Sequence, residues 1–347
     1  MVKPCARHSP PCTTTAHSQR QASKSSTTAA AVKAAVIAPA ATAGSSTSTA
    51  PTRSTATAGA SAGEGGSKVT ETSTPTYEFA VDRADANNPQ AATEYVKDMY
   101  HNYRKAEGVR APNPNYMSKQ TDITEKMRAI LLDWLVEVHL KFKFEMPTLY
   151  LTVNIIDRFL ERKIVLRQKL QLVGVTAMLL ASKYEEMCAP EVADFVYLTD
   201  RAYSAEEILA CESTMLNTLS FRLSVPTVWV FLCRFVKLAG LNDRKSYLLA
   251  RYYAERTLQE YKMLKYLPST IAASAVYMAL KVTHGHVHWS SEMHAATKYS
   301  EATLKPCVTD MVAVINNSGS TSLQAIVKKY SSHRYLRVAK IPLPSFE

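Results

Sequence analysis

The stretch Leu170–Lys183 reads LQLVGVTAMLLASK, and between its ends only Gln171, Thr176 and Ser182 are polar. A helix that is apolar on nearly every side must be surrounded by other helices, as at the centre of a bundle. Gly174 and the alanines of this stretch would let neighbouring helices approach closely. The stretch therefore predicts the central helix of an all-helical domain.

A second stretch of the same kind runs from Leu267 to Lys281, and its Pro268 suits the first turn of a helix. Both stretches share small residues and a terminal lysine. At a shift of 98 residues, Ala177, Ala181 and Lys183 fall on Ala275, Ala279 and Lys281. Two such helices about a domain length apart predict two similar helical bundles in tandem, the alternative being a chance match of small residues.

Other segments also have helical spacing. It begins at Tyr95, and Pro112 ends that first helix. Longer helices are expected over 124–142 and 146–162, and no segment shows sustained strand alternation, so the predicted class is all-α. The expected divisions are a tail at 1–80, a linker with a helix at 81–123, a first bundle at 124–222 and a second at 223–340.

The N-terminal segment has a different composition. Ser, Thr, Ala and Gly dominate residues 1–80, and the first leucine of the chain is Leu131. Such a segment cannot bury enough apolar surface to offset chain entropy, so we expect a disordered tail. Its first 63 residues lack any acid, a composition shared with organelle transit peptides, which is the alternative. No apolar run reaches membrane-spanning length.

The net charge of +11 and the pI near 9.2 would suit a nucleic-acid partner. However, the charge is dispersed, without a run of five or more Lys or Arg, so it is weak evidence. No Cys-x-x-Cys pair occurs, which argues against a zinc site and a disulfide framework and favours a reducing compartment. The cysteines are Cys5, Cys12, Cys188, Cys211, Cys233 and Cys307.

The helix expected at 124–142 carries two apolar stripes on nearly opposite faces. The first stripe consists of Met127, Ile130, Leu131 and Trp134. The second stripe consists of Ala129, Leu132, Val136 and Leu140. One stripe can pack inward. The other must meet either a partner or another element of the same chain, and the spacing alone leaves both possibilities open.

Several longer runs follow one another in a fixed order. They are Met127–His139 (MRAILLDWLVEVH), Thr148–Leu160 (TLYLTVNIIDRFL), Lys169–Gly174 (KLQLVG), Ala181–Glu186 (ASKYEE) and Asp194–Tyr197 (DFVY). Together they resemble the cyclin family over about Val81 to Ala339, and Gln120–Thr124 and Tyr95–Tyr100 favour its B-type (mitotic) branch. The resemblance implies two tandem five-helix cyclin boxes, preceded by a short helix and a disordered tail.

The resemblance implies a non-catalytic subunit that binds and activates a cyclin-dependent protein kinase, with a role at the G2/M transition. Lys183 and Glu212 match the family's residues that grip the regulatory helix of the kinase, where both can make charge-assisted hydrogen bonds. Without the resemblance, Lys183 would be interpreted as a solvated lysine at a helix end. Tyr184, Leu216 and Phe221 match the apolar contacts beside that grip.

The resemblance also implies a substrate-docking patch for proteins with Arg-x-Leu motifs, whose basic residues an acidic side chain would complement. The matching residues are Met127, Ile130, Leu131, Trp134, Glu137 and Gln171. This assigns the first stripe to a partner. Arg128 and Asp157 match an internal ion pair that is structural and ties the first helix of the box to the second.

The tail departs from the family pattern. Without a leucine before Leu131 it cannot hold an Arg-x-x-Leu degradation signal. Ser9-Pro10 and Thr74-Pro75 have the hydroxyl-before-proline pattern that the bound kinase would prefer, so we expect phosphorylation there, the alternative being that the tail is an inert solvated spacer. The loop Cys188-Ala189-Pro190 also differs from the apolar-Pro-Pro usual in the family.

Rival functions find little support. There is no phosphate-binding loop and no His-Glu-x-x-His helix, and His284, His286 and His288 suit a solvated loop better than a metal site. A TFIIB-like transcription factor, which also has two cyclin-type bundles, would carry paired Cys-x-x-Cys motifs in a zinc ribbon. We therefore expect no cofactor, no metal, no membrane and no direct nucleic-acid contact, in a protein of the nucleus and cytoplasm.

Overall fold

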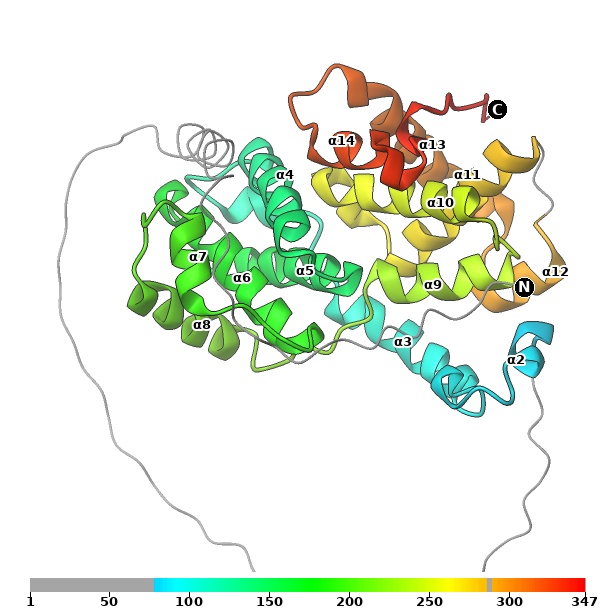
Figure 1. Ribbon diagram of the computed structural model, residues 1–347, viewed down its shortest axis with the longest axis horizontal. Helices are drawn as coiled ribbons and strands as arrows, with labels where there is room; N and C mark the ends of the chain where they lie inside the picture. The colour runs from blue at the N-terminus through cyan, green and yellow to red at the C-terminus, as the bar shows by residue number, and fades with distance from the viewer. Residues whose placement is uncertain (1–77, 286–288, 347) are drawn as a thin grey trace, which may run out of the picture.

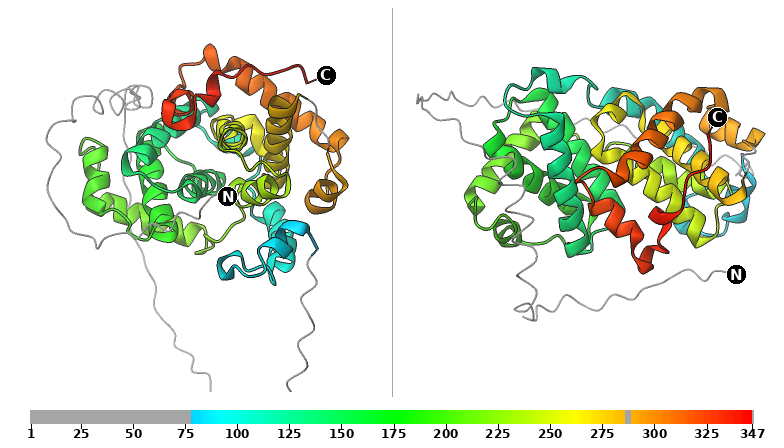
Figure 2. Two further views of the ribbon diagram at one scale, coloured as in Figure 1. Left: turned by 45° about the vertical axis from the view of Figure 1, so that its right-hand side comes forward. Right: turned by 90° about the horizontal axis from the view of Figure 1, so that it is seen from above.

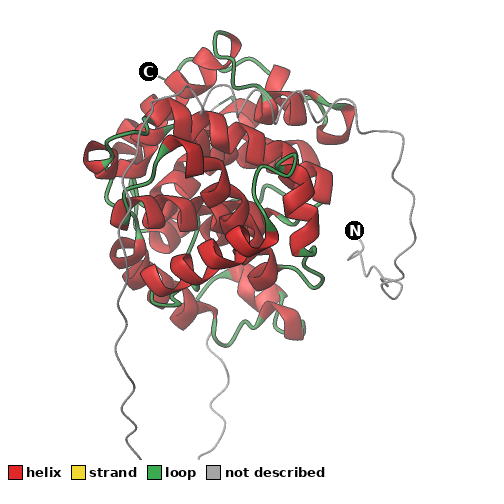
Figure 3. Cartoon of the chain, turned by 90° about the vertical axis from the view of Figure 1, so that its left-hand side faces the viewer, coloured by secondary structure: helices red, strands yellow, loops and turns green. Residues whose placement is uncertain are grey.

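The structure is a computed structural model that describes residues 78–285 and 289–346. Throughout these ranges the regular secondary structure is helical, as the absence of strand colour in Figure 3 shows. Within the same ranges, no helix is long and apolar enough to cross a membrane. The all-α prediction is confirmed. The predicted tail with its Ser-Pro and Thr-Pro sites lies outside the described residues, except for residues 78–80.

The first bundle is built around a buried central helix. Its helices are α4 (Glu125–Phe142), α5 (Met146–Arg162), α6 (Leu170–Glu185), α7 (Val192–Leu198) and α8 (Ala205–Thr218). Every residue of α6 from Leu170 to Ser182 is buried, as its composition predicts. The ends agree with the sequence: the Thr124 side chain caps α4 by accepting from the Met127 amide (3.3 Å), and Pro147 lies in the first turn of α5.

The second bundle repeats this arrangement around α11. Its helices are α9 (Val228–Leu238), α10 (Arg244–Arg256), α11 (Pro268–His284), α12 (Ser291–Thr297) and α13 (Glu301–Asn316), followed by α14 (Ala325–Ser331). The small residues Ala272, Ala275 and Ala279 are fully buried, and α9, α10 and α13 pack around α11. Figure 1 shows the two bundles side by side, so the tandem prediction is confirmed.

A helical segment precedes the first bundle and lies along the second (Figure 1). It contains α2 (Ala80–Ala84) and α3 (Val96–Arg110). Buried charges attach it: Arg234 of α9 binds Asp82 with Nη2–Oδ2 at 2.7 Å, and the Glu107 carboxylate accepts from the Ser269 amide and hydroxyl at 2.9 and 2.7 Å. The remaining elements of the described chain are short 3-10 helices: η1 (Pro89–Ala91), η2 (Tyr116–Lys119), η3 (Arg167–Lys169), η4 (Thr257–Gln259), η5 (Tyr261–Lys265), η6 (Asn317–Gly319), η7 (His333–Tyr335) and η8 (Val338–Lys340).

Helix α4 is enclosed on two sides. On one side α6 approaches so closely that a Cβ atom on Gly174 would lie 2.7 Å from Cδ1 of Leu131. On the other side α14 and η4 of the second bundle pack against α4, and Figure 2 shows the red C-terminal segment beside the first bundle. The Asp133 carboxylate joins these elements by accepting from the Ala325 amide at 2.9 Å and the Gln259 side chain at 2.6 Å.

Candidate partner-binding faces

The predicted grip residues meet at one end of the first bundle. Lys183 lies in the last turn of α6, and its ammonium nitrogen is 2.8 and 3.0 Å from the two carboxylate oxygens of Glu212 on α8. The Lys183 side chain is 44% exposed and that of Glu212 12%. Two opposite charges are thus held in place at the surface, where a partner can reach the lysine.

Large apolar side chains lie close in the chain to the residues of this ion pair. Phe221 is 67% exposed, Tyr184 is 48% exposed, and Leu216 packs half-buried against the core. Phe221 sits in the left-handed region (φ 56°), and its amide donates to the Leu216 carbonyl at 2.9 Å, which fixes the direction of the loop. Met187, which the sequence analysis did not single out, is 99% exposed on the loop after α6. Exposed apolar side chains together with exposed charges are typical of a protein-binding surface.

Acidic residues follow the grip lysine. Burial, and then the neighbouring charge of Glu186, raises the pKa of Glu185. Glu186 has a structural role, because its carboxylate accepts from the Glu145 amide at 2.9 Å and from the Thr148 hydroxyl at the start of α5. Of the two acids that follow Lys183 and Tyr184, Glu186 is therefore held by hydrogen bonds within the fold, whereas Glu185 lies at the open surface.

The predicted docking residues divide into two groups. Met127, Ile130 and Glu137 are half-buried on α4. Leu131 and Trp134 are 0% and 4% exposed and pack in the core, so these two side chains of the first stripe are covered in this structure, and their assignment to the docking patch stays a prediction. For Leu131 the physical reason is Gly174 in α6, which lets that helix close over the leucine side chain.

Gln171 is also buried, with 2% of its surface exposed, at the start of α6. The expectation that it is open to a partner is therefore not met in this conformation. Its amide nitrogen and oxygen have no hydrogen-bond partner among the described residues. A buried amide without partners costs roughly 1–3 kcal/mol for each unsatisfied group, so it is a group that a bound peptide could satisfy.

The predicted ion pair is formed. Arg128 of α4 makes two parallel bonds to Asp157 of α5, with Nε–Oδ1 at 2.6 Å and Nη2–Oδ2 at 2.7 Å, and both side chains are 1% exposed. The Tyr116 hydroxyl donates to the same carboxylate at 2.8 Å. Burial, followed by the Asp157 charge, raises the pKa of Tyr116, so this hydroxyl keeps its proton.

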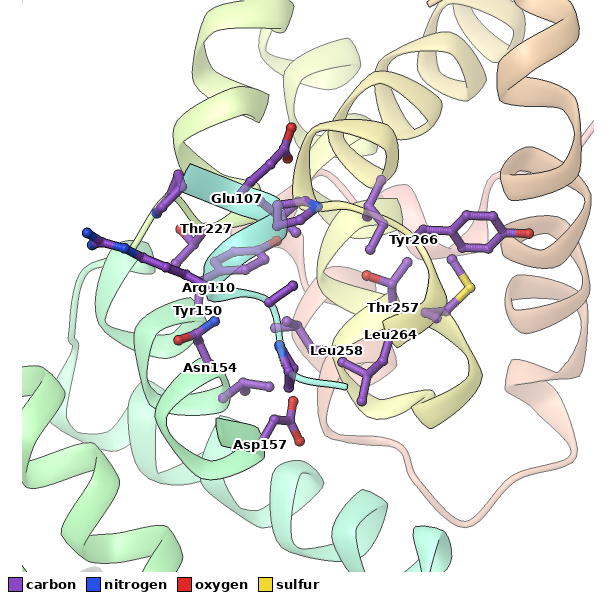
Figure 4. Close-up of a pocket in the computed structure, with 18 of the residues that line it drawn as sticks. Glu107, Arg110, Tyr150, Asn154, Asp157, Thr227, Thr257, Leu258, Leu264 and Tyr266 are labelled. Atoms are coloured by element: carbon purple, nitrogen blue, oxygen red, sulfur yellow. The ribbon is translucent and has the colours of Figure 1, made fainter. Parts of the chain in front are cut away.

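Arg128 also reaches the second bundle, since its Nη1 donates to the Leu258 carbonyl at 3.0 Å. Asp157 and Leu258 line a mainly apolar cavity of about 90 Å³ between the bundles and the end of α3 (Figure 4). The sequence predicted only the tie between α4 and α5. The contact to Leu258 lies 130 residues away in sequence and has no local signal.

Among the described residues, no group of three His, Cys, Asp or Glu side chains is placed to hold a metal ion. His286 and His288 lie outside the described residues, so the interpretation of that histidine loop stays a prediction.

Comparisons with known proteins agree with this architecture. Residues 98–224 match the family "Cyclin, N-terminal domain" and residues 226–344 match "Cyclin, C-terminal domain". G2/mitotic-specific cyclin-1 of Medicago sativa subsp. varia is 48% identical over 77% of this chain and 62% of its own length. G2/mitotic-specific cyclin-2 of Medicago sativa is 46% identical over 75% of this chain and 79% of its own length. The crystal structure of a viral cyclin from herpesvirus saimiri has a TM-score of 0.54 at 19% identity, covering 61% of this chain and 96% of that one.

The two matched domains and the shared architecture define a member of the cyclin family, and the chain belongs to that family. Within the family, its similarity is to plant mitotic cyclins, which confirms the predicted resemblance to the B-type branch. The chain spans about three-fifths of the length of the first of these relatives.

Proposed function

We propose that this chain is a non-catalytic regulatory subunit that binds and activates a cyclin-dependent protein kinase at the G2/M transition. The observation that carries the proposal is the Lys183–Glu212 pair at the end of the bundle, with Tyr184 and Phe221 exposed beside it. Membership of the cyclin family and similarity to G2/mitotic-specific relatives support it.

The mechanism follows from what a protein kinase requires. Its regulatory helix must hold a glutamate against the lysine that binds the ATP phosphates. A rigid subunit that binds this helix only in its inward position shifts the population toward the active state, by as much as its affinity for the two states differs. Lys183 and Glu212 would hydrogen-bond the kinase backbone and helix end, while Tyr184, Leu216 and Phe221 cover its apolar side chains.

A binding titration tests the kinase-binding site. Lys183→Glu and Glu212→Lys should each weaken the affinity for the kinase, by about 2–5 kcal/mol if a buried charge is left unpaired in the complex. Lys169→Glu is a matched control, because Lys169 forms a similar exposed pair with Glu207 (2.8 Å) near the opposite end of α6. Equal affinity of the Lys183→Glu and Lys169→Glu variants would exclude the grip assignment.

Phosphoryl-transfer assays with and without the kinase test the proposed activation. The chain prepared free of kinase should show no phosphoryl transfer, and adding it to the kinase should raise the kinase's activity by a large factor. Phosphoryl transfer that persists after rigorous removal of kinase would contradict a non-catalytic role.

A second part of the proposal concerns substrate selection. Met127, Ile130 and Glu137 would form the accessible rim of an Arg-x-Leu docking site on α4, with Leu131 and Trp134 as its apolar floor. The unsatisfied Gln171 amide at the start of α6 supports the proposal, since a peptide backbone could supply the partners that it lacks.

Substrate kinetics test this part. Met127→Ala with Ile130→Ala should raise KM for a substrate that carries an Arg-x-Leu motif and leave a short peptide without the motif unaffected. An equal change for both substrates would exclude docking on this face.

The TFIIB-like alternative is less well supported, because the sequence has no Cys-x-x-Cys motif for a zinc ribbon. We propose no direct contact with nucleic acid or membrane, and a location in both nucleus and cytoplasm.

A further inference from the structure

The cavity between the two bundles contains none of the residues assigned above to kinase binding or to substrate docking. We call it the interbundle cavity. Its volume is about 90 Å³, its walls are mainly apolar, and it is open toward the surface (Figure 4). Apolar cavities of about 150 Å³ bind benzene, so a space of this size with an open side admits a single ring.

The apolar wall of the interbundle cavity is built from separate parts of the chain. Val153 comes from α5, Pro226 from the segment between the bundles, and Leu258, Leu264 and Ile271 from the second bundle. Val153 and Ile271 are 5% and 7% exposed, so packing holds both in place. A molecule in the cavity would therefore touch both bundles at once and stabilise their present arrangement.

The two acidic residues in the wall already have partners. Asp157 accepts from Arg128 and from the Tyr116 hydroxyl, and the Glu107 carboxylate accepts from the Ser269 amide and hydroxyl. A cation in the cavity would gain little from carboxylates that are engaged in this way, and it would lose its hydration. The interior of the cavity therefore favours an uncharged, apolar group.

One side of the cavity is positively charged. Arg110 and Asn154 line it on the same side, as Figure 4 shows. Arg158, which is only 3% exposed, donates from Nη1 to the Asn154 oxygen at 3.3 Å. Among the described residues, neither Arg110 nor Arg158 is within ion-pair distance of a carboxylate. Arginine is almost never buried to the extent of Arg158 without an anionic partner, so an anion on this side would be stabilised.

Hydrogen-bond donors remain on the same side. Arg110 donates to the Ser224 carbonyl, and a guanidinium has five N–H donors, so others are left for a ligand. Asn154 accepts from Arg158 through its oxygen, which turns the N–H groups of its amide away from that arginine. Burial, and then the positive charges of Arg162 and Arg110, lowers the pKa of Arg158 to about 10, as expected for a buried cation without an acid beside it.

We propose that the interbundle cavity binds a small organic acid, in which a compact apolar group such as a phenyl ring is joined to a carboxylate by a short chain. The ring would fill the apolar interior, and the carboxylate would accept from Arg110 and Asn154 near the charge of Arg158. An apolar interior with a few placed polar groups is typical of small-molecule sites. The proposal does not depend on the proposed kinase binding, because none of the kinase-binding residues lines the cavity.

A titration of the full chain with 3-phenylpropionate, followed by ligand-observed NMR, tests the proposal. Binding should saturate with a Kd of about 1 mM or below, as expected for a ligand of this size. The neutral analogue 3-phenylpropanamide should bind about tenfold more weakly or worse, because it lacks the charge-assisted hydrogen bonds. Acetate, which has no ring, should not saturate over the same range. The Tm of the chain should rise with the concentration of 3-phenylpropionate.

Two pairs of variants locate the site. Leu264→Trp should fill the cavity from a half-buried position and abolish binding, whereas Leu209→Trp, at an exposed position outside the cavity, should leave it unchanged. Arg110→Gln should remove the preference for the acid over the amide and keep the affinity for the amide. Arg83→Gln, which removes the same charge from an exposed arginine on α2, should keep the preference.

Circular dichroism establishes that each variant is folded, and if Leu264→Trp is not, the Arg110→Gln comparison decides. Equal affinity of the wild type for the acid and the amide would overturn the proposal, as would the absence of saturable binding. Unchanged binding by a folded Leu264→Trp variant, or a full preference for the acid in Arg110→Gln, would also overturn it, since the ligand would then bind elsewhere. Each of these outcomes leaves the proposed kinase activation as it stands.

Discussion

Two ion pairs in the first bundle have the same charges and opposite surroundings. Arg128–Asp157 joins α4 to α5 with both side chains 1% exposed, whereas Lys183–Glu212 joins α6 to α8 with the lysine 44% exposed. A buried charge must find every partner inside the fold, and Asp157 does so through Arg128 and Tyr116. An exposed pair contributes little to stability, so its charges stay available to another molecule. Burial therefore separates a structural pair from one suited to recognition.

The largest effect is expected from breaking the buried pair. Asp157→Ala would leave the Arg128 guanidinium charged and unpaired in the core and would also remove the acceptor of the Tyr116 hydroxyl. In a urea titration, the free energy of unfolding should fall by about 5 kcal/mol, the upper end of what breaking a buried ion pair costs. Lys169→Met, which breaks the exposed pair with Glu207, is the control and should change it by less than about 1 kcal/mol. Similar losses in the two variants would contradict the distinction.

Trp134 tests whether the predicted docking stripe belongs to the buried core or to the exposed surface. Trp134→Ala should cost about 3–5 kcal/mol and lower Tm, because the side chain is 4% exposed in the core. Met127→Ala, at a half-buried position of the stripe, should cost only about 1 kcal/mol. An unchanged Tm for Trp134→Ala, with loss of substrate docking, would restore the exposed-patch interpretation.

The sequence predicted the elements better than their surroundings. A helix apolar on all sides, such as Leu170–Glu185, must be central whatever surrounds it, and Leu267–Lys281 repeats the signal. The stripes of α4 could not be assigned in this way, because α14, which begins at Ala325, covers one of its sides. Sequence spacing shows that a face is apolar, and only the packing shows what lies against it.

For the candidate site, too, some features were predicted from the sequence and others became visible only in the packing. Lys183 and Glu212 were predicted as grip residues through family resemblance, and the structure then showed that they pair with each other and that the Tyr184 hydroxyl hydrogen-bonds the Ser224 hydroxyl. The burial of Arg158 without an acid partner has no signal in the sequence, because its surroundings come from three separate elements and depend on long-range packing. Contacts between residues more than a hundred positions apart, such as Arg128 with Leu258, are likewise invisible to local patterns.

A smaller effect is expected from a buried histidine whose charged form lacks a partner. His139 donates from Nε2 to the Glu145 carbonyl at 3.0 Å, and its Nδ1 has no hydrogen-bond partner among the described residues. Burial, and then the charge of Lys329, lowers its pKa below the usual 6.5, while Glu255 and Glu186 act in the opposite direction.

Because the unfolded chain binds this proton more readily, stability should be complete above about pH 6.5 and should fall as the pH drops below it. Urea titrations between pH 5 and 7.5 measure this slope. His139→Gln should flatten the slope relative to wild type, whereas His101→Gln, at an exposed position, should leave it as it is. A slope unaffected by His139→Gln would show that protonation of other groups causes the loss.

The smallest effect on stability is expected at the exposed pair, where the comparison is sharpest. Lys183→Met removes the ammonium group and keeps much of the aliphatic stem, so Glu212, whose side chain is 12% exposed, loses a partner and keeps access to water. The free energy of unfolding should change by less than about 1 kcal/mol, because a solvated ion pair gains little over its hydrated charges. The same substitution should clearly weaken binding to the kinase, since there the lysine would be taken out of water. Chemical denaturation and calorimetry on one preparation measure both quantities. A loss of stability as large as that of Asp157→Ala, with unchanged kinase affinity, would make Lys183–Glu212 a second structural pair and would remove the main support for the proposed grip.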